Sequence, residues 1–153
     1  MVKVAVVGCG HWGKNLVRNF SELGALSAIS DPNEALAAKF SADYDVPALD
    51  FDAVLESACD GVVIAAPAPL HAPLAEKAFA AGKHVYVEKP LAMTLEEADR
   101  MIEAARKAER HLMVGHLLQY HPVFARLREI VANGALGDIS YICLLYTSPS
   151  PRD

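Results

Sequence analysis

The chain has 153 residues, enough for about one domain with its own core, and 53 % of them are hydrophobic. Its 14 basic and 19 acidic residues give a formal charge of −5. Because Lys and Arg do not cluster, neither nucleic acid nor anionic lipid is expected as a partner. No apolar run approaches the about 18 residues of a membrane span, and the N-terminus lacks a signal-peptide pattern, so we expect a cytoplasmic protein with no membrane partner.

The first predicted elements are a strand and a helix joined by glycines. Residues 2–7 are nearly all apolar and β-branched, which predicts a strand covered on both faces and ended by Gly8. Apolar residues then recur at helical spacing over 16–23, and Gly24 is placed to cap this helix. A second strand and helix are expected over 25–31 and 33–42.

The alternation resumes after a less regular stretch over 46–58. The further predictions are, in order, a strand at 61–67, a helix at 70–79 closed by Gly82, a strand at 84–90, a helix at 94–109 and a strand at 112–117. Thr94 and Glu97 form a capping box at the start of the fourth helix. Strands separated by helices require right-handed crossovers, so we expect an α/β fold with a doubly wound parallel sheet.

The first strand-to-helix turn, GCGHWG, carries a ligand-binding pattern. Gly8, Gly10 and Gly13 fit G-x-G-x-x-G, in which the glycines permit a tight turn, close approach to a diphosphate, and packing of helix on strand. Asp31 ends the second strand, where a carboxylate accepts hydrogen bonds from a ribose diol. This context favours a dinucleotide over the alternative, a glycine-rich turn without a ligand. Because Asp31 repels a 2′-phosphate and SDPNEA contains no Arg, NAD is favoured over NADP.

A second pattern, VEKP, ends the strand that begins at His84. Adjacent strand residues point to opposite faces, so only one of Glu88 and Lys89 is expected to face a given cleft. A partly desolvated lysine beside a cofactor can donate to a substrate hydroxyl or transfer a proton. The alternative is a surface lysine before Pro90.

Together these motifs resemble the Gfo/Idh/MocA oxidoreductases, the glucose-fructose oxidoreductase and inositol dehydrogenase family. The resemblance covers residues 1–142, and its most specific piece is Glu88-Lys89-Pro90. The quoted stretches that carry it are GCGHWG, AAPAPLHAPLAEKAFAAGKHVYVEKP and MVGHLLQYHP.

The resemblance implies a Rossmann NAD(P)-binding domain followed by a second α/β domain that contacts the substrate. Members transfer a hydride between a sugar-like alcohol carbon and nicotinamide, and the full-length parent is expected to be a homo-oligomer. Lys89 is the implied catalytic residue, and a histidine of the second domain is the implied acid/base. The implied cofactor-binding residues are Gly8, Gly10, His11, Trp12, Gly13, Asp31, Ala66, Pro67, His71, Glu88 and Lys89.

Ala66 departs from the family, which usually has Thr before the proline, and Trp12 has simple packing as an alternative role. GHLLQYHP is most similar to the branch that oxidises the third carbon of UDP-N-acetyl-aminosugars or their uronic acids. Its implied substrate residues are His116, Gln119 and Tyr120.

No metal is expected, because Cys9, Cys59 and Cys143 are far apart and the histidines are not at ligand spacing.

The domain boundaries follow from the same reasoning. Residues 1–120 are expected to form the dinucleotide-binding domain, and residues 121–142 the crossover helix and first strand of a truncated second domain. CLLYTSPSPRD, residues 143–153, is the translation of a common transposase library adapter and is therefore expected to be non-native. We expect a fragment that binds NAD, is inactive alone, and tends to self-associate through uncovered surface.

Two further interpretations stay open. One is a stand-alone nucleotide-binding module without catalysis, which requires a natural C-terminal tail. The other is a structural α/β domain whose glycine turn binds no ligand. Binding of NAD by a folded sample separates the last of these from the other two.

Overall fold

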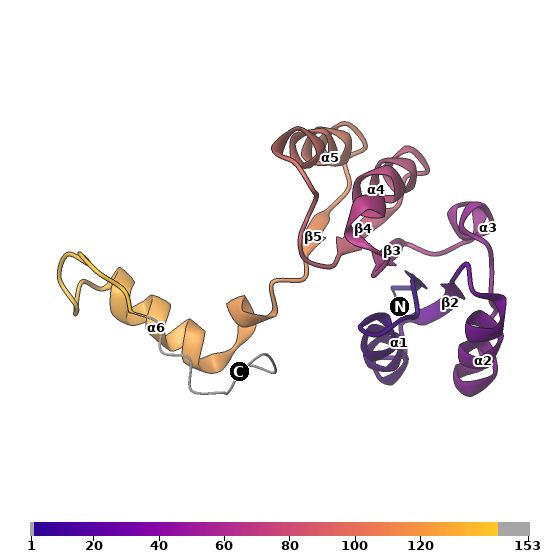
Figure 1. Ribbon diagram of the computed structural model, residues 1–153, viewed down its shortest axis with the longest axis horizontal. Coiled ribbons are helices and arrows are strands. Elements are labelled where there is room, and N and C mark those ends of the chain that lie inside the picture. The colour runs from indigo at the N-terminus through magenta and orange to yellow at the C-terminus, as the bar shows by residue number, and fades with distance from the viewer. Residues whose placement is uncertain (1, 144–153) are drawn as a thin grey trace, which may run out of the picture. The chain divides into compact units, whose positions relative to one another are not determined.

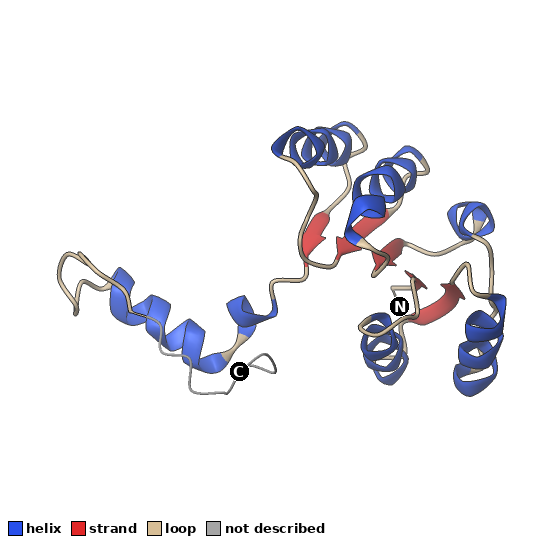
Figure 2. Ribbon diagram, in the orientation of Figure 1, coloured by secondary structure: helices blue, strands red, loops and turns tan. Residues whose placement is uncertain are grey.

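The computed structural model describes residues 2–143, which divide after Gly115 into two compact units (Figures 1 and 2). The first unit is an α/β domain, and the second is a helical segment. No helix among residues 2–143 is long and apolar enough to cross a membrane.

The first unit contains a five-stranded parallel sheet with the order β2-β1-β3-β4-β5. Its strands are β1 (Val4–Val7), β2 (Leu26–Ser30), β3 (Gly61–Ile64), β4 (His84–Val87) and β5 (Leu112–Val114). The predicted doubly wound α/β fold is confirmed. The direction of strand addition reverses at β1, because β2 lies on one side of it and β3 to β5 follow on the other. This reversal creates the switch point at which such sheets bind ligands.

Helices cover both faces of the sheet (Figure 1). They are α1 (Gly13–Glu22), α2 (Glu34–Tyr44), α3 (Phe51–Glu56), the 3₁₀ turn η1 (Ala68–Leu70), α4 (His71–Ala80) and α5 (Leu95–Lys107). Alternate residues of β1 enter two separate cores: Ala5 and Val7 join the core beneath α4 and α5, and Val6 joins the core beneath α1. This two-sided burial explains why β1 reads as a continuous apolar run.

Local signals in the sequence end and begin the helices as expected. Gly24 and Gly82 adopt positive φ angles after α1 and α4. Thr94 accepts a hydrogen bond from the backbone N–H of Glu97 at 3.2 Å, and the Glu97 carboxylate accepts from the N–H of Met93 at 2.9 Å. The predicted capping signal therefore forms, with its return bond one residue earlier than in the usual capping box.

The stretch over 46–58, expected to be irregular, contains α3 and a parallel bridge between Ala48 and Ile29. Six residues are too short to display a helical period. The available signal was Asp50, whose carboxylate caps α3 by accepting from the N–H of Ala53 at 2.7 Å.

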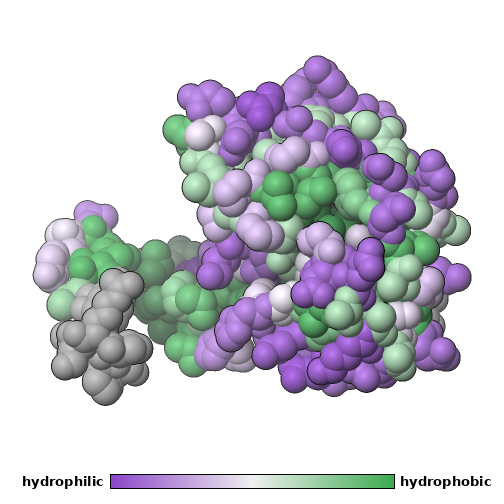
Figure 3. Space-filling model, turned by 45° about the vertical axis from the view of Figure 1, so that its right-hand side comes forward, coloured by the Kyte–Doolittle hydropathy of each residue, from purple (hydrophilic) through white to green (hydrophobic). Residues whose placement is uncertain are grey.

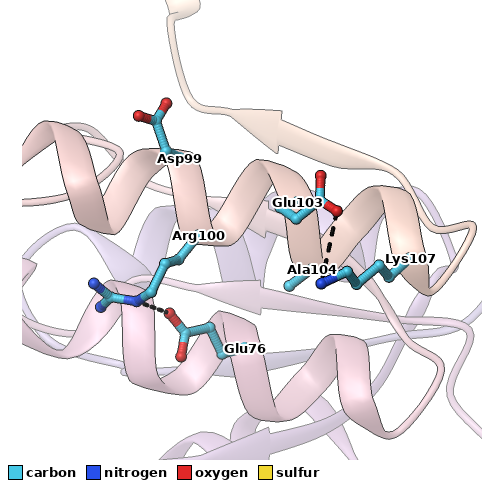
Figure 4. Close-up of a pocket in the computed structure, with 6 residues that line it drawn as sticks. All are labelled: Glu76, Asp99, Arg100, Glu103, Ala104 and Lys107. Atoms are coloured by element: carbon cyan, nitrogen blue, oxygen red, sulfur yellow. Dashed lines mark hydrogen bonds and ion pairs between the residues drawn. The ribbon is translucent and has the colours of Figure 1, made fainter.

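The helices α4 and α5 lie side by side and carry charged side chains on their outer surface (Figure 4). Arg100 pairs with Glu76 at 3.0 Å, and Lys107 pairs with Glu103 at 3.7 Å. Such exposed pairs contribute only about 0–1 kcal/mol each. The shallow hollow that α4 and α5 form here is lined mainly by exposed charged side chains.

The second unit consists of the 3₁₀ turn η2 (Leu117–Tyr120) and the helix α6 (Pro122–Ala132). The crossover helix expected within residues 121–142 is thus present, whereas the first strand expected in the same range is absent, and residues 137–142 are irregular. A strand needs a neighbour to receive its backbone hydrogen bonds, and residues 116–143 supply none. The prediction for the C-terminal tail lies outside the described residues, except at Cys143.

Apolar side chains of the second unit are largely exposed, and much of the visible surface of this unit is green in Figure 3. None of the residues 116–143 is buried. The exposed large apolar side chains of α6 are Val123, Phe124, Leu127 and Val131.

Candidate functional site

The strand register brings the predicted site residues to one edge of the sheet. Val7 pairs with both Ser30 and Ile64, and Ile64 pairs in turn with Val87. The residues that follow these strand ends therefore emerge at the same level, at the carboxyl edge where doubly wound folds bind ligands. They are Gly8, Asp31, Ala65 and Glu88.

The three glycines of the first turn have different surroundings, and two of them leave no room for a side chain. Gly8 has a φ of +92°, and a Cβ there would lie 2.8 Å from the backbone of Ala65 and Ala66. A Cβ at Gly13 would overlap the carbonyl group of Gly8, so the start of α1 can pack on the turn only without a side chain. A Cβ at Gly10 would meet no atom within 4 Å. The space above Gly10 is therefore open to a ligand.

A cleft of about 850 Å³ lies at this edge. It brings together seven of the predicted cofactor residues: Gly8, Gly10, His11, Trp12, Asp31, Ala66 and Pro67. Within the described part of the chain, no Lys or Arg lines it. Its other lining residues, which sequence reasoning did not identify, are Val7, Ser30, Pro32, Asn33, Leu36, Asp50, Phe51, Ala65, Leu70 and Leu74.

Asp31 is held in one orientation at the end of β2. One carboxylate oxygen accepts from the backbone N–H of Cys9 at 2.7 Å, and the other accepts from the N–H of Asn33 at 2.9 Å. Each oxygen keeps a second lone pair for another donor. Burial, and secondarily the Asp31 charge, raise the pKa of the Cys9 thiol to about 12, so Cys9 stays a neutral thiol inside the turn.

His71 is buried and is not among the residues that line the cleft. Its side chain is 1 % exposed, and its two ring nitrogens lie 2.8 Å from the carbonyl oxygens of Ala66 and Pro90. The ring therefore connects a loop that lines the cleft with the turn after β4. Any influence of His71 on a ligand passes through these backbone groups.

Glu88 and Lys89 differ in burial, as expected of consecutive residues at a strand end. Glu88 is 6 % exposed, and it accepts hydrogen bonds from the indole of Trp12 at 2.8 Å and the hydroxyl of Tyr86 at 3.1 Å. Lys89 is exposed, and its peptide bond to Pro90 is cis. Neither residue is among those that line the cleft around Gly10.

The expected substrate residues belong to the second unit. His116, Gln119 and Tyr120 are all exposed there, and the Gln119 side chain accepts from Arg128 at 3.1 Å. Across residues 2–143, no group of three or more His, Cys, Asp or Glu side chains is arranged to hold a metal ion.

Asp50 is the missed residue with the clearest signal. It precedes α3 as an N-cap and lines the cleft together with Asp31. Aspartate before a short helix is recognisable in a sequence. The position of Asp50 beside β2 could not be recognised in the sequence, because it depends on the bridge between Ala48 and Ile29.

The known proteins that are similar to this chain include two dehydrogenases. The inositol 2-dehydrogenase of Corynebacterium glutamicum (strain ATCC 13032) is 32 % identical, over 97 % of this chain and 46 % of that protein. The UDP-N-acetylglucosamine 3-dehydrogenase of Acidithiobacillus ferrooxidans is 31 % identical, over 84 % of this chain and 41 % of that protein. The chain thus spans less than half the length of these relatives.

Solved structures give the same result. A 3-ketoreductase from Actinomadura kijaniata, crystallised with NADP and TDP-benzene, aligns with a TM-score of 0.79 and 27 % identity, over 87 % of this chain and 42 % of that one. Residues 2–116 match the Gfo/Idh/MocA family, described as an oxidoreductase family with an NAD-binding Rossmann fold. The expected family is confirmed: this chain belongs to the Gfo/Idh/MocA oxidoreductases.

Proposed function

We propose that this chain is the dinucleotide-binding part of an NAD-dependent dehydrogenase that transfers a hydride between nicotinamide and an alcohol carbon of a sugar or sugar nucleotide. The observation that carries the proposal is the cleft at the switch point of the sheet, with open space above Gly10 and the oriented carboxylate of Asp31. Relatives named as inositol and UDP-N-acetylglucosamine dehydrogenases support the substrate class.

The residues of the cleft fit a dinucleotide. The diphosphate would lie over Gly10, where the positive end of α1 and its first backbone N–H groups favour an anion. The adenosine ribose would donate its hydroxyl hydrogens to the remaining lone pairs of Asp31. Bound nicotinamide supplies the hydride acceptor or donor, and the protein supplies binding and orientation.

NAD is proposed over NADP because of the charges at the ribose end. Asp31, Glu34 and Asp50 line a hollow that adjoins the cleft, and no Lys or Arg lines it among residues 2–143. A 2′-phosphate there would meet carboxylates and no cation. The 3-ketoreductase solved with NADP shows that a similar protein can hold the phosphorylated cofactor, so this preference needs a direct test.

Lys89 is proposed as the catalytic residue of the full-length parent. Its exposed ammonium group follows β4 at the carboxyl edge and can donate to a substrate hydroxyl. The acid/base histidine, the remaining substrate contacts and an oligomer interface are proposed for a second domain, of which residues 121–142 are the start. His116, Gln119 and Tyr120 are proposed substrate residues, and a UDP-N-acetyl-aminosugar is the proposed substrate type. A chain without that domain is proposed to bind NAD in the cytoplasm but not to turn over.

The first experiment is a titration of the chain with NADH and NADPH, followed through the emission of Trp12, the only tryptophan. NADH is expected to bind at least roughly tenfold more tightly than NADPH, the effect of about 1.4 kcal/mol of charge repulsion. Gly10→Ala is expected to weaken NADH binding without changing the melting temperature, because its Cβ meets no protein atom. Absence of binding by a folded sample would instead favour a structural α/β domain.

A second experiment concerns the full-length parent. Lys89→Ala is expected to lower turnover by roughly a hundredfold or more, while NAD affinity changes by no more than a few-fold. Equal losses in both would make Lys89 a cofactor-binding residue. Sequencing of the source DNA beyond the codon for Ile142, without a transposase adapter, decides between a truncated dehydrogenase and a small nucleotide-binding module.

A further inference from the structure

The hydrogen bond between Trp12 and Glu88 spans the carboxyl edge of the sheet. Trp12 follows β1 and Glu88 follows β4, and β3 lies between these strands. The 2.8 Å bond from the indole nitrogen to the carboxylate therefore crosses above the end of β3, joining residues 76 positions apart. One wall of the cleft is thus attached to the strand end that precedes Lys89.

The Glu88 carboxylate, which accepts this bond, is held in place by two further hydrogen bonds. The oxygen that receives the indole N–H also lies 3.1 Å from the Tyr86 hydroxyl, and the other oxygen lies 3.2 Å from the backbone N–H of Lys89. A Cβ at Gly115 would lie 2.5 Å from the Tyr86 hydroxyl and 3.0 Å from the Glu88 carboxylate. The absence of a side chain at Gly115 therefore leaves room for the side chains of Tyr86 and Glu88.

The two ends of the bond differ in their access to a ligand. Trp12 lines the cleft and is 43 % exposed, whereas Glu88 is 6 % exposed and does not line it. A dinucleotide in the cleft would reach the indole ring but not the carboxylate. We therefore propose that Glu88 is a positioning residue, which acts on the cofactor by holding the indole of Trp12 as a fixed wall of the cleft.

This assignment rests on the proposed dinucleotide binding and changes the role expected of Glu88. A direct cofactor ligand would contribute to affinity whatever residue stands at position 12. A positioning residue contributes only while the indole N–H is present, because its effect passes through that group. The two roles therefore differ in how substitutions at Trp12 and Glu88 combine.

The test is a double-mutant cycle on the 153-residue chain, with NADH affinity measured by calorimetry for the wild type, Glu88→Ala, Trp12→Phe and the double variant. Each single variant is expected to bind NADH roughly fivefold more weakly, the worth of about one hydrogen bond. The double variant is expected to match the single variants within roughly twofold. Losses that multiply would overturn the proposal, since Glu88 would then act independently of Trp12.

Spectroscopy of the ligand-free protein tests the same bond without NADH. In Glu88→Ala the Trp12 emission is expected to shift to longer wavelength and lose anisotropy, because the freed indole meets more water. Glu88→Gln keeps an acceptor oxygen and is expected to restore most of the wild-type emission. Glu22→Ala, which removes an exposed carboxylate at the far end of α1, is the matched control and is expected to leave the emission unchanged.

One measurement does not depend on any variant being folded. The single indole N–H of the wild type is expected to exchange slowly with deuterium, because it donates to a buried carboxylate; exchange as fast as that of a free indole would overturn the proposal. If the wild type fails to bind NADH, the proposed function falls together with this role. If the wild type binds NADH but the losses multiply, only the role of Glu88 falls.

Discussion

The two units of the chain contain similar amphipathic helices but differ completely in burial. In the first unit, α1 buries Leu16 and Val17 against the sheet. In the second unit, α6 has apolar side chains at comparable spacing, and none is buried. The difference shows that helical periodicity creates an apolar face without creating a core. A core requires a second apolar surface, which the sheet supplies only in the first unit.

Within the described residues, only the first unit contains all the elements that its own core needs. Both faces of the sheet there are covered by helices formed from the intervening sequence, so each strand finds its neighbours within residues 2–115. Among residues 116–143, the second unit has one α-helix, and no residue in this range is buried. The four predictions below test this comparison with matched substitutions.

The largest difference is expected between two phenylalanines. Phe79 in α4 is 2 % exposed, and Phe124 in α6 is 39 % exposed. Phe79→Ala is expected to lower the free energy of unfolding by about 3–5 kcal/mol through lost burial and a residual cavity. Phe124→Ala is expected to change it by less than about 1 kcal/mol. Urea denaturation followed by circular dichroism measures both, and similar losses would contradict the division into a packed and an unpacked unit.

A second pair compares glycines. Gly13→Ala places a methyl group against the carbonyl of Gly8. This substitution is expected to lower the free energy of unfolding by about 2–3 kcal/mol and the melting temperature by about 10 °C or more. Gly13 begins α1, whereas Gly134 follows the C-terminal end of α6, and a Cβ at Gly134 would meet no atom within 4 Å. Gly134→Ala is expected to leave the main calorimetric transition in place despite local backbone strain at its φ of +74°. A shared decrease would mean that α6 melts together with the sheet.

The third prediction concerns the thiols. Cys9 and Cys59 are buried in the first unit, and Cys143 is exposed in the second. With the pKa of Cys9 raised to about 12, its thiolate is scarce at pH 8. Cys143 is expected to react with a disulfide reagent roughly a hundredfold faster than Cys9 or Cys59. Cys143→Ser should abolish the fast phase, and urea should expose the other two thiols. A fast phase that survives this substitution would show that the first unit opens readily.

The smallest expected effect is a pH dependence of folding stability that arises from His84, at the amino edge of the sheet. Burial, then the charges of His111 and Arg110, lower the pKa of His84, while Asp60 opposes the shift. The neutral ring accepts the backbone N–H of His111 at 3.0 Å. Because the folded pKa is the lower one, full stability holds above the unfolded pKa of about 6.5, and part of it is lost as pH falls through that value toward the folded pKa.

His84→Gln is expected to remove this part of the pH dependence. The melting temperatures of the variant and the wild type should therefore approach one another as pH falls from about 7.5 to about 5, that is, from roughly one unit above to roughly one and a half units below the unfolded pKa. His116→Gln, an exposed position of the second unit, is the matched control. A constant difference between His84→Gln and the wild type at all pH values would assign His84 a packing role only.

The parallel fold and the location of the cleft were predictable because they depend on short-range patterns. Gly8, Gly10 and Gly13 identified the turn, and Asp31 identified the end of the second strand. The contacts of His71 and Glu88 were not predictable. The distant partners of both side chains are brought close only by the packing of β1, β3, β4 and the turn after β4.

Short-range patterns in the sequence predicted most of the strands and helices and the edge of the sheet that carries the cleft, but they missed α3 and extended β3, β4 and β5 by three residues each. These features follow from side-chain period, glycine conformation and helix capping, which act within a few residues. Which polar side chains line the cleft depended instead on packing between elements that are distant in the sequence. Trp12 and Glu88 meet because parallel strands align their carboxyl ends, and that alignment is a property of the assembled sheet.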